Sequence, residues 1–119
     1  MAHHYTRRDL TQMLEPLLFP PSDEVLRYVT REGSRARDAC WLRVLHCRYP
    51  SWNDFTCAKA LEIIEDMRYR VLDQVYQELL TARTVLRKHG AVASDLLFVL
   101  SRTPELQRGV EELQSTTAL

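Results

Sequence analysis

The residues with the most obvious chemical potential lie in one stretch, HCRYPSWNDFTC, at positions 46–57. Thiols and imidazoles bind metal ions, and a thiol beside a histidine base can act as a nucleophile. Cysteines of structural zinc sites usually stand two to four residues apart, whereas Cys40, Cys47 and Cys57 are seven and ten residues apart. His46 and Cys47 are neighbours, whose side chains on a helix point about 100° apart. We therefore expect no metal, no cofactor and no catalytic residue, and we interpret the cysteines as core residues.

The same stretch has the residues of a corner between two helices. Pro50 denies the preceding residue a helical conformation and should end one helix. Ser51 is expected to cap the next helix, with Asp54 near its exposed amides. Trp52 and Phe55 are expected to anchor that helix against the preceding one.

Length and composition predict one ordinary globular domain. The chain has 119 residues, of which 45% are hydrophobic and 27% charged, so we expect a single helical domain over 1–119 with flexible ends at 1–6 and 115–119. Basic and acidic residues number 16 each. The odd number of cysteines favours a reducing, cytoplasmic location over a secreted disulfide framework, and no apolar run is long enough to span a membrane.

Helix punctuation divides the chain, and sustained strand alternation is missing. We predict an all-α fold, a bundle of about five or six helices around one long central helix. Ser22 should cap the second helix and Gly33 should end it. Thr103 should cap the last one, after an apolar run at 96–100 that is too continuous to be amphipathic and is expected to be buried. The expected helices cover 7–18, 22–32, 34–48, about 52–88, the apolar run and a last segment from 103.

The long helix is the most informative element. Residues 52–88 lack proline and glycine, and a helix of that length would measure roughly 55 Å, more than the 30–35 Å expected for a compact domain of this mass. Such a helix must protrude, break or meet a partner. Arg68 falls in its apolar arc, while Tyr69, Tyr76 and Leu80 gather on its polar side. These four residues suggest a second contact surface, used by a homodimer or another protein; alternatively, the N-terminal helices wrap the long helix on two sides.

A group of arginines precedes and follows Gly33. With a tight turn there, Arg27, Arg31 and Arg35 could form a row, and Arg37 would extend it to a patch that meets acidic groups or phosphates. A solvated face is the simpler interpretation. The neutral net charge argues against a nucleic-acid binder, which usually carries a strong basic excess.

These patterns predict a class of function without naming a partner. We expect a non-catalytic protein-protein interaction module, a small regulator, adaptor or inhibitor of bacterial or viral origin, homodimeric through the long helix. The expected partner-binding residues are Arg68, Tyr69, Tyr76 and Leu80 on that helix, with Arg27, Arg31, Arg35 and Arg37 for an acidic partner. The alternative is a dimeric helical protein that binds double-stranded RNA by its shape with the same arginines.

Overall fold

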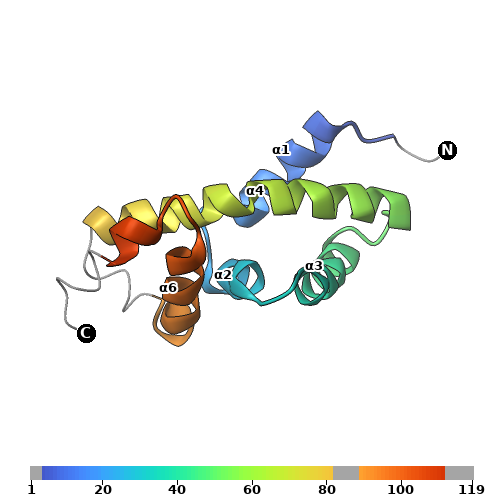
Figure 1. The fold of residues 1–119 in the computed structure, drawn as a ribbon. Coiled ribbons are helices and arrows are strands. Elements are labelled where there is room, and N and C mark those ends of the chain that lie inside the picture. The colour runs from blue at the N-terminus through green and yellow to red at the C-terminus, as the bar shows by residue number, and fades with distance from the viewer. Residues whose placement is uncertain (1–3, 82–88, 112–119) are drawn as a thin grey trace.

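The protein is described by a computed structural model that covers residues 4–81 and 89–111 (Figure 1). The described residues contain helices and turns and no strand, which confirms the all-α prediction. The elements are α1 (Arg7–Leu18), α2 (Asp23–Thr30), α3 (Ser34–Arg48), α4 (Asp54–Thr81), the 3-10 helix η1 (Gly90–Val92) and α6 (Ala93–Arg102). A further helical turn follows at 107–111.

The first helix boundaries follow from local hydrogen bonding. Thr6 and Asp9 form a capping box at the start of α1, in which each side chain accepts from the other residue's backbone N–H. The Ser22 hydroxyl accepts from the Val25 N–H and caps α2, as predicted. Gly33 has φ 77°, a left-handed conformation that costs glycine little. It turns the chain from α2 into α3, although α2 itself ends at Thr30, two residues earlier than expected.

The long helix α4 begins at Asp54, and the prediction that Ser51 caps it was wrong. The Asn53 side chain accepts from the Thr56 N–H at 2.8 Å, which is the hydrogen bond of an N-cap residue. Ser51 is held instead in a turn that the Trp52 N–H closes on the Tyr49 carbonyl. The predicted continuation of this helix over 82–88 lies outside the described residues.

The other helices pack along α4 and make the molecule elongated, with extents of 57 × 24 × 23 Å. In Figure 1, α2, α3 and α6 line one long side of α4, and α1 crosses it. The buried face of α4 recurs every three or four residues, as a helix packed on one side requires. Its buried residues are Cys57, Ala60, Ile63, Ile64, Met67, Val71, Leu72 and Val75. Because these helices are placed one after another along α4, together they cover a helix that is longer than a compact domain is wide.

Two residues of the helical corner are exposed, contrary to expectation. Cys47 is exposed, while the other two cysteines are buried as predicted. Phe55 is 67% exposed, with the Lys59 ammonium 5.4 Å from its ring centroid. Both errors have one geometric cause. Each residue stands two positions from a buried residue of its own helix, Leu45 or Cys57, and two positions correspond to about 200° of helical rotation.

The α6 region also differs from the sequence prediction. The Thr103 hydroxyl donates back to the Val99 carbonyl at 3.0 Å, so it does not cap a following helix. The N–H groups of Leu106 and Gln107 donate to the Thr103 carbonyl and start the final turn. This turn lies over α4, because a Cβ built on Gly109 would sit 1.6 Å from the Tyr76 hydroxyl oxygen.

Among the described residues, no helix has both the length and the apolar character needed to cross a membrane.

Candidate functional site

A pocket with a volume of about 410 Å³ opens where α2 ends, beside α3, the middle of α4 and the end of α6. Three of the arginines selected from the sequence line it: Arg31, Arg37 and Arg68. It lies on the turn that Gly33 creates, so residues from four helices reach it. The lining residues are Thr30, Arg31, Glu32, Gly33, Arg37, Arg68, Phe98, Val99, Arg102 and Thr103.

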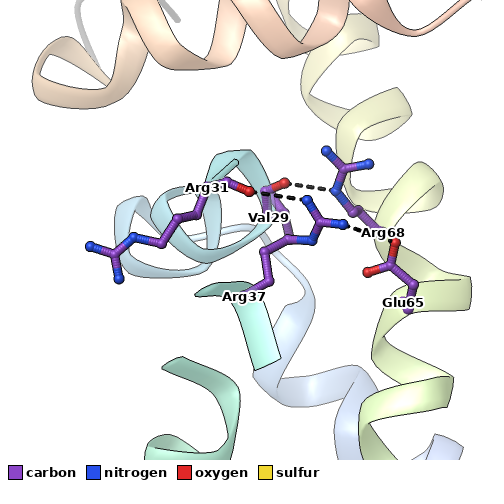
Figure 2. Close-up of polar contacts among 5 residues, drawn as sticks. All are labelled: Val29, Arg31, Arg37, Glu65 and Arg68. Carbon is purple, nitrogen blue, oxygen red and sulfur yellow. Dashed lines mark hydrogen bonds and ion pairs between the residues drawn. The ribbon is translucent and has the colours of Figure 1, made fainter. Parts of the chain in front are cut away.

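The carbonyl groups at the end of α2 position two of these arginines. A helix leaves its last carbonyls without intrahelical partners. Arg68 Nε donates to the Val29 carbonyl at 2.7 Å, and Arg37 Nη1 donates to the Arg31 carbonyl at 3.0 Å. Figure 2 shows both guanidinium groups side by side at this helix end. The charge of Arg68 on the apolar arc of α4 is therefore accommodated within the chain by the C-terminal end of the α2 dipole.

This pair of guanidinium groups has little negative charge around it. Burial lowers the pKa of Arg68 from its ordinary value, the positive charge of Arg37 lowers it further, and Glu65 opposes the shift. Glu65 Oε1 lies 3.4 Å from Arg37 Nη2, and its side chain is about half exposed. Arg37 Nε is buried and has no hydrogen-bond partner among the described residues. An anion entering the pocket would thus meet two adjacent cations, of which Arg37 is paired with the half-exposed Glu65 and Arg68 has no ion pair with a described carboxylate.

The Arg31 side chain takes a different direction. Its backbone carbonyl faces Arg37, but its guanidinium points away from the Arg37–Arg68 pair (Figure 2). Arg31 Nη1 lies 2.6 Å from the sulfur of Cys40. Arg31 lines both this pocket and a neighbouring one. Its positive charge therefore adds to the electrostatic potential of the pocket more than its N–H groups add to direct contacts with a ligand there.

The last turns of α6 supply two residues that the sequence analysis did not select. Phe98 is 43% exposed, and the Arg102 guanidinium carbon lies 4.4 Å from its ring centroid. Phe98 was expected to be buried within the run 96–100, but only Leu96 and Leu100 are fully buried there. The available signal was the spacing of Phe98 and Arg102, four residues apart, which places them on one helix face.

The three arginines predicted to form a row do not all line one pocket. Arg27 is exposed on α2 and lines the neighbouring pocket, where Glu24 and Asp95 offset its charge. Arg35 is exposed in the first turn of α3 and is not among the residues that line the arginine pocket. The structure brings Arg31, Arg37 and Arg68 to the pocket and leaves Arg27 and Arg35 outside it.

The residues predicted for a second contact surface on α4 have different environments. Tyr69 is 42% exposed, and burial raises its pKa, with further contributions from Asp73 and Glu105. Tyr76 is partly buried and packs on the core beneath the final turn. The side chain of Leu80 lies outside the described residues. Tyr69 is therefore the exposed member of this set on the surface that the structure describes.

The chemistry that the pocket offers is hydrogen-bond donation and positive charge. Guanidinium groups stay protonated at physiological pH, so they bind anions but do not exchange protons as general acids or bases. Phe98 and Val99 add apolar surface at the edge. In the described part of the chain, no group of three or more histidine, cysteine or acidic residues is arranged to hold a metal ion.

The fold and the pocket together define a small all-α protein with an arginine-lined cavity. Comparisons with protein-family models, with curated proteins and with solved structures found no match to the chain.

Proposed function

We propose that this protein is a non-catalytic protein-protein interaction module that binds an acidic segment of a partner protein in the arginine pocket. The observation that carries the proposal is the gathering of Arg37, Arg68 and Arg102 around one concavity, with Glu65 as the carboxylate paired to Arg37. Arginine side chains suit such recognition because the planar guanidinium binds carboxylates and phosphates through parallel N–H bonds.

A protein segment fits the pocket better than a nucleic-acid duplex. Duplex binders neutralise many phosphates along an extended surface, whereas here the arginines surround one cavity. Glu65 on α4 and Glu32 in the pocket lining stand beside these arginines, and their negative charges would repel a phosphate backbone. The free thiols of the chain also suit the reducing interior of a cell. A small cytoplasmic adaptor or regulator agrees with these features.

Fluorescence polarisation with two labelled probes tests the proposal: a hexaglutamate peptide and a duplex RNA of about two helical turns. We expect the peptide to bind and Arg102→Gln to weaken it about tenfold or more, because a charge-assisted hydrogen bond contributes roughly 1.5–3 kcal/mol. Arg35→Gln is the matched control, since it removes the same charge from an exposed residue outside the pocket.

Two results would contradict the proposal. Equal losses in the two variants would mean that general charge attraction, not the pocket, holds the peptide. Binding of the duplex with an affinity that falls about a thousandfold or more between 50 and 200 mM salt, as multiple phosphate contacts produce, would instead favour the RNA-binding alternative.

We further propose that the protein forms a homodimer through α4. The support is the exposure of Tyr69 on it. Light scattering over a micromolar concentration series tests this, with Tyr69→Glu as the disrupting variant. A monomer mass that stays constant across the series would remove the homodimer from the proposal and leave the arginine pocket unaffected.

A further inference from the structure

The charge balance of the arginine pocket specifies its ligand more closely. Four arginines line the pocket, but Arg31 turns its guanidinium away from the Arg37–Arg68 pair and Arg37 is paired with Glu65, while Glu32 in the lining is exposed. The positive charges of Arg68 and Arg102 are the two that remain without an ion pair to a described carboxylate. An aspartate or glutamate carboxylate, or one phosphodiester of a nucleic acid, would neutralise one of them. A phosphomonoester carries about −1.5 to −2 charges at pH 7 and would neutralise both.

The free hydrogen-bond donors are also numerous enough for such a group. Arg68 uses Nε on the Val29 carbonyl, and no described residue accepts from its two Nη groups. The Arg102 guanidinium carbon lies over the Phe98 ring, 4.4 Å from its centroid, and such a contact with a ring does not use the N–H donors. No described carboxylate lies within ion-pair distance of either guanidinium group. Phosphoryl groups offer three acceptor oxygens, one more than a carboxylate.

From this arrangement we propose that the pocket binds a phosphorylated serine, threonine or tyrosine in the partner segment, held between Arg68 and Arg102. This inference rests on the proposed function and makes its acidic ligand a phosphomonoester. The exposed part of Phe98 and the neighbouring Val99 then contact an apolar side chain beside the phosphorylated residue. Glu65 opposes this binding through its negative charge, because it lies close enough to act on Arg68 as well as to pair with Arg37.

Three synthetic peptides of one sequence provide the test, Ala-Ala-X-Phe-Ala with both ends blocked, where X is phosphoserine, glutamate or serine. Inorganic phosphate and sulfate are titrated separately. Isothermal titration calorimetry should show the phosphoserine peptide binding about tenfold tighter than the glutamate peptide, since one additional charge-assisted bond is worth about that factor. The serine peptide should not bind measurably.

Variants at three positions connect this preference to the pocket. Arg102→Gln should weaken binding of the phosphopeptide roughly 10- to 100-fold, the range for losing one charge-assisted bond. Arg35→Gln should leave its affinity unchanged. Glu65→Gln should strengthen binding several-fold, because the opposing negative charge is removed while Arg37 keeps a neutral partner; a purely structural role of Glu65 predicts no gain. Circular dichroism confirms that each variant is folded.

The possible outcomes separate this inference from the proposed function. If the phosphoserine and glutamate peptides bind with equal affinity and both depend on Arg102, the pocket has no preference for a phosphomonoester. The proposal that it binds an acidic segment would still stand. If inorganic phosphate binds as tightly as the phosphoserine peptide, the ligand is not a segment of a partner protein. Binding of the phosphopeptide that Arg102→Gln and Arg35→Gln affect equally would overturn the pocket as its site.

Discussion

The contact between Gly109 and Tyr76 gives the sharpest test of how the final turn lies on α4. A methyl group at Gly109 would sit 1.6 Å from the Tyr76 hydroxyl oxygen and 2.6 Å from Cζ. The hydroxyl would have to retreat by about 1.8 Å to reach the 3.4 Å at which ordinary contact begins. The substitution Gly109→Ala thus opposes two effects, a gain in helix propensity and a cost of overpacking.

The magnitudes predict the sign of the result. Replacing glycine by alanine within a helix stabilises it by up to about 1 kcal/mol, whereas forcing a packed side chain aside typically costs about 1–3 kcal/mol. We expect Gly109→Ala to lower the free energy of unfolding by about 1 kcal/mol in the natural chain. With Tyr76→Leu, which lacks the clashing atoms, Gly109→Ala should raise the free energy of unfolding by a few tenths to about 1 kcal/mol.

Urea unfolding followed by far-ultraviolet circular dichroism measures all four proteins of this double-mutant cycle, which yields the coupling energy directly. Gly90→Ala is the control, because a Cβ there has no atom within 4 Å. If Gly109→Ala stabilises the natural chain as much as it does the Tyr76→Leu variant, the final turn does not cover Tyr76. Tyr76 would then be available to a partner, as the sequence had suggested.

Three further predictions follow from buried and exposed groups. Arg68→Met should lower the free energy of unfolding by about 1.5–3 kcal/mol in urea denaturation, because the last carbonyls of α2 lose a charged donor; a loss of less than about 0.5 kcal/mol would show that this hydrogen bond does not stabilise the fold. His89 is almost fully buried with Nδ1 2.6 Å from Asp23 Oδ1, so His89→Ala should lower the thermal midpoint by several degrees, whereas an unchanged midpoint would contradict the pairing. In a thiol titration with a chromogenic disulfide at neutral pH, Cys47 should react rapidly in the native protein and the two buried thiols much more slowly than after denaturation; three equally fast thiols would contradict their burial.

Part of the slow thiol chemistry has an electrostatic origin. Burial raises the pKa of Cys57, and the nearby charge of Asp54 raises it further. A raised pKa leaves less of the reactive thiolate at any pH below it. Alkylation of Cys57 in the native protein should therefore need a higher pH than alkylation of Cys47, and mass spectrometry of labelled peptides over a pH series checks this order. Earlier labelling of Cys57 would refute it.

Local signals in the sequence determined the helices and most of their boundaries. Ser22, Gly33 and Pro50 mark helix ends because capping and backbone restriction depend on residues only a few positions apart. The buried face of α4 also follows from helical periodicity. The same reasoning predicted Ser51 as the N-cap of α4, whereas Asn53 is the N-cap residue. Two residues that can cap a helix stand close together in the sequence, and the turn closed on the Tyr49 carbonyl holds Ser51 outside the helix.

The tertiary structure decided which side chains meet. Helical periodicity gives the face on which a residue lies but not the element that covers that face, so Tyr76 looked free until the final turn was placed over it. The arginine pocket has the same origin. Arg68 and Arg102 stand 34 positions apart in the sequence, and both line one pocket with the end of α2. A helix end with unpaired carbonyls attracts cations from any element within reach, and which elements come within reach is set by the packing of the whole chain.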